Sequence, residues 1–401
     1  MMNKKELELY VHIPFCIRKC DYCDFLSFPG SSRMQEEYVG KLLEEIGYRG
    51  ARAGEYQAVS VFIGGGTPSI LNEEQITSIL LALKESFDIL PEAEITMEMN
   101  PGTVTREGLL ACGRAGVNRV SIGLQSADDK ELRNLGRIHT YDDFLKSYQR
   151  IRMAGFDNVN VDLISAIPGQ TMESWKNTLK MVTRLKPEHI SAYSLIIEEG
   201  TPYYDRYGSS LPSEKYSSCS GGLAGLPELP DEDTEREMYY FTQSYLADQG
   251  YERYEISNYA KNGRRCRHNI GYWTGVPYLG LGLGSSSYMD GCRFHNTSDY
   301  KAYCSTCFKN EEESDKALKQ EFERLSIEEK MEEYMFLGLR LMKGVSATGF
   351  AGSFGQNIRE IYGMKLDAME EEGLMEFKEG FYRLTSRGID ISNYVMSQFL
   401  M

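Results

Sequence analysis

Three cysteines near the N-terminus, Cys16, Cys20 and Cys23, have the residue type and spacing of a metal-ligand set. Soft thiolates in this number suit zinc or an iron–sulfur cluster. No cysteine or histidine follows them closely, because the next cysteine is Cys112. Three protein ligands leave one metal position open for chemistry or for a bound ligand. A zinc site completed by a distant histidine or cysteine is the alternative.

The elements that must position these cysteines alternate along the first half of the chain. Strand-like and amphipathic helix-like segments follow one another, and this order predicts βαβ units and a parallel sheet. The cysteines come directly after the first strand. The six strand-like segments are residues 8–13, 59–65, 94–100, 119–125, 158–165 and 189–197.

Polar residues occupy alternate positions of these strands, so one face of the predicted sheet is polar. A parallel sheet that is covered on both faces is normally apolar on both. We therefore predict a partial barrel whose lumen binds a hydrogen-bonding ligand at the C-terminal strand ends. An ordinary half-solvated sheet is the alternative. The inward-facing set is Tyr10, His12, Thr96, Glu98, Asn100, Ser121, Gln125, Asn160 and Asp162.

The charge balance excludes some classes of partner. The 44 basic and 59 acidic residues give a net charge of −15, which argues against a nucleic-acid partner. No apolar run reaches the roughly 18 residues of a membrane span, and the polar N-terminus does not resemble a signal peptide. The sequence predicts a soluble cytoplasmic protein with reduced cysteines. Peripheral membrane association and a monomeric or dimeric state remain open.

Four regions are predicted along the 401 residues. Residues 1–200 form the barrel, and residues 201–235, rich in Gly, Ser and Pro, form a mobile loop insertion. Residues 236–325 cap the barrel. Residues 326–401 are predicted to form a helix, a hairpin and a helix, an order that indicates a small winged-helix-like module. From Ile327 onward this module has 12 acidic and 8 basic residues, and its net negative charge argues against DNA binding.

The cysteine spacing resembles that of the radical S-adenosylmethionine (SAM) superfamily. The motifs "GGGTP", "EMNPGT", "SIGLQS", "LGRIHT" and "DLISAIPGQT" resemble the family of anaerobic coproporphyrinogen III oxidase and HemW, the heme chaperone. The resemblance implies a partial (β/α)6 barrel and a 4Fe-4S cluster held by Cys16, Cys20 and Cys23, with SAM on the fourth iron. The residues that it implies as SAM contacts are Tyr10, Gly65, Gly66, Thr67, Glu98, Gln125, Arg137 and Asp162.

Two features favour the chaperone subgroup over the oxidase. The oxidase has another cysteine two residues after the third ligand, where this chain has Phe25. The segment "HNIGYW" resembles the HNxxYW heme motif, in which an imidazole can ligate iron and aromatic rings can contact a porphyrin. The implied heme contacts are His268, Asn269, Tyr272 and Trp273, with His295 as a second candidate axial ligand. An aromatic anchor in the core is the other interpretation of this motif.

The resemblance thus implies a heme chaperone that transfers heme to an acceptor protein, and it argues against oxidase activity. Oxygen-independent coproporphyrinogen III oxidation is the alternative function. No catalytic residue is assigned. Ala166 departs from the family pattern, which has glycine there, and this puts SAM affinity in question. Cys304 and Cys307 are either two ordinary thiols or half of a metal site, and Cys266 is an alternative thiolate near the heme.

Overall fold

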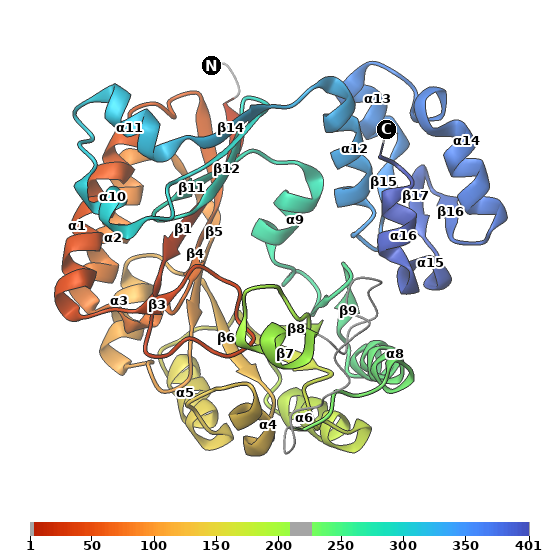
Figure 1. Cartoon of the computed structure of the whole chain (residues 1–401), viewed down its shortest axis with the longest axis horizontal. Coiled ribbons are helices and arrows are strands. Elements are labelled where there is room, and N and C mark those ends of the chain that lie inside the picture. Colours follow the sequence, from red (N-terminus) through yellow and green to blue (C-terminus); the bar gives the residue numbers. More distant parts are fainter. Residues whose placement is uncertain (1–3, 209–226, 401) are drawn as a thin grey trace.

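The computed structural model describes residues 4–208 and 227–400. Its centre is a run of six parallel strands in chain order, which confirms the predicted α/β fold. These strands curve around the middle of the molecule in Figure 1. They are β1 (Lys5–Ile13), β4 (Tyr56–Gly65), β5 (Ile89–Met99), β6 (Arg119–Gln125), β7 (Val159–Ser165) and β8 (His189–Ser194).

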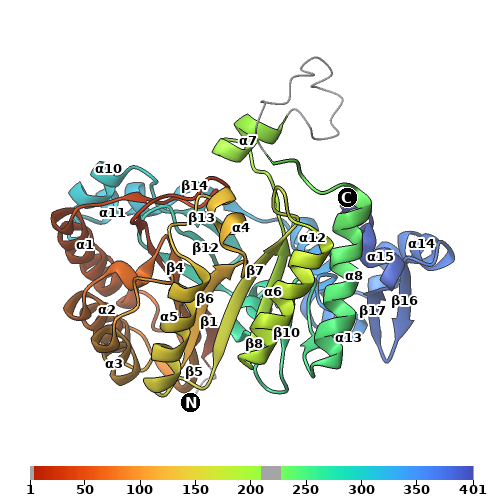
Figure 2. The same ribbon diagram turned by 90° about the horizontal axis from the view of Figure 1, so that it is seen from below.

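Helices connect these strands and lie along the outer side of the sheet (Figures 1 and 2). Residues at alternate strand positions, such as Leu9, Val120 and Val161, are fully buried in the main apolar core. This packing leaves the polar positions on the inner face, as the alternation predicts. The connecting helices are α1 (Ser32–Gly50), α2 (Glu73–Ser86), α3 (Arg106–Arg114), α4 (Asp129–Asn134), α5 (Tyr141–Met153) and α6 (Met172–Arg184), with the short η1 (Pro68–Ile70) after β4.

The sheet extends beyond the six predicted strands at both edges. On one side β11 (Tyr278–Leu281) runs parallel to β1, and three antiparallel strands follow it. On the other side β8 pairs with β10 (Asn258–Ala260), which pairs with β9 (Glu252–Arg253). The three strands beyond β11 are β12 (Ser286–Met289), β13 (Cys292–His295) and β14 (Gln320–Arg324).

Residues after β14 build a second, smaller core. Helix α12 (Ile327–Gly338) begins it, and a three-stranded sheet in the order β15-β17-β16 lies among its helices, as Figure 1 shows. The helix–hairpin–helix order of the predicted winged-helix-like module is present. The other elements are β15 (Val345–Ser346), α13 (Ala347–Phe354), α14 (Ile358–Glu371), β16 (Met375–Lys378), β17 (Phe381–Leu384), α15 (Ser386–Asp390) and α16 (Ser392–Ser397).

The region between barrel and module contains further helices. Helix α7 (Pro202–Tyr207) lies within the loop expected at residues 201–235, and residues 209–226 of that loop lie outside the described residues. Helix α9 (Arg267–Thr274) lies between the sheet and α12 (Figure 1). Among the described residues, no helix is long and apolar enough to cross a membrane. The remaining helices are α8 (Glu232–Asp248), α10 (Tyr300–Ser305) and α11 (Glu311–Leu318).

Candidate functional site

The loop with the three cysteines is closed by its own two-stranded sheet. In that sheet β2 (Phe15–Cys16) pairs with β3 (Phe28–Pro29). Inside the loop, the Asp21 carboxylate lies 2.6 Å from a guanidinium nitrogen of Arg206 on α7. The His12 Nε2 lies 2.8 Å from the Leu26 carbonyl oxygen near the other end of the loop. These contacts fix the loop over the C-terminal ends of the strands.

A cavity of about 460 Å³ lies under this loop. All three cysteines line it, together with residues at the C-terminal ends of β4, β5, β6 and β7. Seven of the eight residues predicted to contact SAM also line it: Gly65, Gly66, Thr67, Glu98, Gln125, Arg137 and Asp162. The structure therefore brings the cysteines and the expected SAM residues together in one space.

Tyr10, the eighth predicted SAM residue, does not line this cavity. Its hydroxyl lies 3.0 Å from Nδ1 of His12, and its ring stacks on Phe62 at 6.3 Å. Tyr10 therefore supports His12, which in turn holds Leu26 at the end of the cysteine loop. The sequence placed His12 on the inner face but gave it no role.

Two of the cysteine sulfurs are linked by a chain of hydrogen bonds. The Arg137 guanidinium donates to the Cys20 sulfur at 3.8 Å and to the Asn100 side-chain oxygen at 3.2 Å. The Asn100 amide donates to the Thr67 hydroxyl at 2.7 Å, and that hydroxyl donates to the Cys16 sulfur at 3.4 Å. Both ends of the chain therefore donate to a sulfur. Such donors stabilise negative charge on thiolates and influence the reduction potential of a cluster bound there.

The donor set suits an iron–sulfur cluster with three thiolate ligands. In the parts of the chain that the structure describes, no three His, Cys, Asp or Glu side chains are grouped closely enough to hold a single metal ion. A cluster needs no such grouping, because each thiolate binds a different iron atom. Cys16, Cys20 and Cys23 would hold it, and the cavity beside them leaves room for a ligand of the fourth iron.

Glycines bring backbone close to this cavity. Gly65 has a φ of 110°, a conformation that L side chains rarely adopt. A Cβ atom on Gly66 would lie 2.7 Å from the Phe15 carbonyl oxygen, so the loop cannot accept a side chain there. The Gly65 N–H donates to Oε2 of Glu98 at 3.0 Å. Glu98 is thereby fixed at the cavity wall.

The charge state of Glu98 depends on what occupies the cavity. Burial, with a smaller contribution from nearby Asp162, raises the pKa of Glu98 to about 8. The carboxyl group is therefore mostly neutral at pH 7 while the site holds no cation. A positive charge brought next to it by a ligand would favour the carboxylate, so binding would release a proton. Glu98 thus suits recognition of an amino group.

Asp162 is held as a hydrogen-bond acceptor on the neighbouring wall. The Ser121 hydroxyl donates to one of its oxygens at 2.9 Å, and the Asn160 amide donates to the other at 2.7 Å. A carboxylate has further acceptor capacity on both oxygens, and this capacity suits the hydroxyl groups of a ribose. Ser121 and Asn160, which the alternation also predicted on the inner face, therefore position the Asp162 carboxylate.

Two non-glycine residues near the cavity have a left-handed backbone. Gln125 has a φ of 73°, and Ala166 has a φ of 60°. This conformation costs roughly 1–2 kcal/mol for a residue with a Cβ atom. Ala166 therefore has a backbone conformation that glycine would adopt at lower cost. Its side chain is buried and does not line the cavity.

Helix α9 carries the "HNIGYW" segment and is capped from the barrel. The carboxylate of Glu94 on β5 accepts hydrogen bonds from the backbone N–H groups of Arg267 at 3.1 Å and His268 at 3.3 Å. The Cys266 side chain provides no cap of its own. A negative charge at a helix N-terminus is stabilising. The sheet therefore fixes both the start and the direction of α9.

His268 faces the barrel lumen rather than the surface. The residue is 1% exposed, and its ring stacks on Phe62 at 5.1 Å. Its Nδ1 lies 2.8 Å from the Ser60 hydroxyl, and its Nε2 lies 3.0 Å from the Tyr272 hydroxyl. Burial lowers the pKa of His268 to about 3, so the ring is neutral. Coordination of heme iron by His268 would require it to leave one of these two partners.

The other predicted heme contacts point elsewhere. The Trp273 ring lies under the Arg340 guanidinium at 4.4 Å and lines a second cavity, toward α12. Asn269 is half-buried on α9. His295 on β13 lies 2.9 Å from the Asn296 carbonyl oxygen and 3.3 Å from the Glu321 carboxylate. It lines neither the cysteine cavity nor the Trp273 cavity.

Cys266, Cys304 and Cys307 lie apart from Cys16, Cys20 and Cys23. Cys304 packs partly against the main core, and Cys307 is exposed. Cys266 is buried, with its sulfur 3.4 Å from Oε1 of Glu94, and burial raises the pKa of its thiol. None of these three lines the cavity of the predicted cluster.

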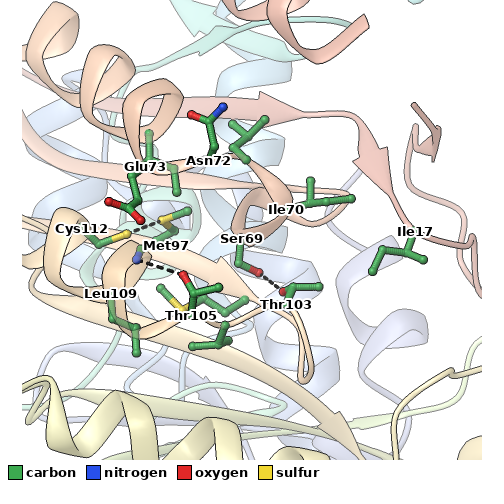
Figure 3. A pocket seen from close by; sticks show the side chains of 15 residues that line it. Ile17, Ser69, Ile70, Asn72, Glu73, Met97, Thr103, Thr105, Leu109 and Cys112 are labelled. Carbon is green, nitrogen blue, oxygen red and sulfur yellow. Dashed lines mark hydrogen bonds between the residues drawn. The ribbon is translucent and has the colours of Figure 1, made fainter. Parts of the chain in front are cut away.

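Another cavity, of about 370 Å³, lies on the outer side of the sheet, between α2 and α3 (Figure 3). Its walls are mainly apolar, and they include Met97, with the thiol of Cys112 3.4 Å from the Met97 sulfur. The Ser69 and Thr103 hydroxyls form a hydrogen bond at its rim. No residue predicted to bind a cofactor lines this cavity, so it is not part of the candidate site.

Comparisons with known proteins show which family and fold this chain resembles. The model of the Radical SAM superfamily matches residues 10–182, and the model of the HemN C-terminal domain matches residues 325–391. The protein named Heme chaperone HemW of Lactococcus lactis is 33% identical, covering 100% of this chain and 99% of that protein. Its namesake in Bacillus subtilis is 34% identical, covering 98% of both chains. The structure of coproporphyrinogen III oxidase (HemN) from Escherichia coli is similar in fold, with a TM-score of 0.81, 21% identity, and coverage of 99% of this chain and 91% of that one.

Proposed function

The chain belongs to the radical SAM family of the heme chaperone HemW, and from this membership we propose that it binds heme and delivers it to an acceptor protein. The observation that carries the proposal is similarity to HemW proteins over the full length of both chains. The solved oxidase structure is 21% identical, so it supports the fold alone.

The cysteine cavity is proposed to hold the 4Fe-4S cluster and SAM. When bound, the cluster would supply an iron for the SAM amino and carboxylate groups and a source of one electron. The Glu98 carboxylate, which the Gly65 N–H holds in place, would accept hydrogen bonds from the amino group, and Asp162 would accept hydrogen bonds from the ribose. Thr67 and Arg137 would donate to the Cys16 and Cys20 sulfurs that hold the cluster. The wall residues thus orient the ligand, and the closed cysteine loop limits access of water.

Heme is proposed to bind outside this cavity, at α9. A macrocycle and SAM cannot share a space of about 460 Å³ that also contains the cluster. Helix α9 has a separate position between sheet and module, and Trp273 already lines a different cavity there. His268 links α9 to Ser60 on β4, so it either ligates heme after a local rearrangement or positions the helix.

A heme titration of the anaerobically reconstituted protein, run beside an assay with coproporphyrinogen III, tests this function. We expect a saturable Soret band and no formation of protoporphyrinogen. In the His268→Ala variant we expect weakened or altered heme binding with iron and sulfide content unchanged, because the cysteines belong to a separate loop. Turnover of coproporphyrinogen III at roughly 1 per second, or within two decades below it, would refute the chaperone function.

A further inference from the structure

A cavity of about 430 Å³ joins α9 to the C-terminal module, and its volume is in the range of small-molecule sites, about 300–1,000 Å³. Its walls come from the end of α9, from β12, from one side of α12 and the turn after it, and from α13 and β17. No single element could form it. Its aromatic wall residues are Trp273, Tyr288, Tyr334, Phe354 and Phe381.

The charge of this cavity differs from that of the whole protein. Lys330 and Lys343 line it, and neither forms an ion pair with any residue that the structure describes. Lys343 lies over the Phe381 ring at 4.3 Å. Glu333, the one carboxylate among the wall residues, is 2.7 Å from the Arg293 guanidinium and is therefore neutralised. In a chain of net charge −15, two unpaired cations at a cavity favour an anionic ligand.

Aromatic walls and lysines without ion pairs together select a class of ligand. Flat aromatic molecules pack on ring faces, and carboxylates pair with ammonium groups. We propose that this cavity binds the heme carried by the protein, with the macrocycle against Trp273 and the other rings and its propionates toward Lys330 or Lys343. The inference rests on the proposed function, because heme is the planar dicarboxylate that this function supplies.

The wall residues also account for release of the ligand. The cavity has neither histidine nor cysteine among its wall residues, and its phenol groups belong to Tyr288 and Tyr334. Heme that is held mainly by aromatic contacts and by pairing of its own propionates with lysines can pass to an acceptor that provides a stronger axial ligand. His268 then acts as a positioning residue, since its bonds to Ser60 and Tyr272 fix the helix that presents Trp273.

The test compares hemin with its dimethyl ester, in which both carboxylates are masked. For the unaltered protein we expect hemin to bind about tenfold more tightly than the ester, the effect of one lost charge-assisted contact. The double variant Lys330→Gln, Lys343→Gln should lose that preference. The matched control, Lys301→Gln with Lys309→Gln, changes two exposed lysines away from the cavity and should retain it.

A second variant tests occupancy of the cavity itself. Ser353→Trp places a large ring at the exposed rim on α13 and should abolish hemin binding, while iron and sulfide content stay unchanged. If hemin binds the unaltered protein but neither the lysine pair nor Ser353→Trp affects it, this site is wrong and the chaperone function stands. If hemin does not bind the unaltered protein at all, the proposed function itself fails.

Discussion

Replacing Glu98 by glutamine should stabilise the protein that lacks cofactors while weakening SAM binding. The side chain lines the cysteine cavity, and burial raises the pKa of its carboxyl group from the ordinary value of 4.5 to about 8. Because the pKa of Glu98 is higher in the folded protein than in the unfolded chain, its contribution to the free energy of unfolding is fully present below about pH 4.5. This contribution is lost as the pH rises through about 8, because ionisation is then more favourable in the unfolded chain. Glutamine has the same shape and does not ionise, so it removes this pH dependence.

The size of the effect follows from the shift in pKa. One unit corresponds to about 1.36 kcal/mol, so the full shift at pH 8 would amount to about 5 kcal/mol. Glu98 is only half-buried beside a cavity, so solvent screening reduces this to about 2 kcal/mol. The Gln variant should equal the unaltered protein in free energy of unfolding near pH 5 and exceed it by about 2 kcal/mol at pH 8.

Urea denaturation of the cluster-free protein between pH 5 and pH 8 measures this difference. The matched control is Glu92→Gln, which changes an exposed carboxylate on the same strand. SAM affinity of the reconstituted Glu98→Gln variant should fall by about tenfold or more, the effect of a lost bond to a charged group. A stability difference that does not change with pH, or a more stable unaltered protein at pH 8, would refute the assignment of a neutral carboxyl group at the cavity wall.

Three further changes test the same cavity. Cys20→Ala should abolish the 4Fe-4S absorbance while the protein stays folded, and near-full iron and sulfide in that variant would contradict the ligand assignment. Thr67→Val should lower the midpoint potential of the cluster, because the reduced state loses a donor to the Cys16 sulfur, whereas Thr67→Ser keeps the hydroxyl and should preserve the potential. Asp162→Ala should weaken SAM binding by about 1.5–3 kcal/mol with the cluster retained, as measured by equilibrium titration, and equal affinity would make Asp162 structural.

The barrel could be predicted from the sequence because period-two alternation and βαβ order both have a direct physical cause. Each polar residue at an alternate strand position, such as Glu98 or Asp162, lies inward because its apolar neighbours pack on helices. The cysteines could be placed at the same end because they follow the first strand. These inferences needed only local pattern and the geometry of parallel strands.

Other features depend on contacts between distant segments and have no local pattern. The strand β11 joins the sheet beside β1 although the two strands lie far apart in the sequence, and no periodicity indicates this pairing. The orientation of His268 is set by Ser60 and Tyr272 and by the Glu94 cap, so its motif alone could not show that it faces the lumen. The cavity beside Trp273 requires α12, a helix that the chain reaches only after four further strands and two helices.

The most direct test of the account is a heme-transfer measurement on the protein that carries both its cluster and SAM. The protein loaded with heme is mixed with an apo-protein that has an axial histidine, and the Soret bands of donor and acceptor are followed together with the cluster signal. The account predicts that heme leaves the donor and appears in the acceptor while iron, sulfide and bound SAM remain constant. Absence of heme binding, with decarboxylation of coproporphyrinogen III that depends on the cluster, would contradict it.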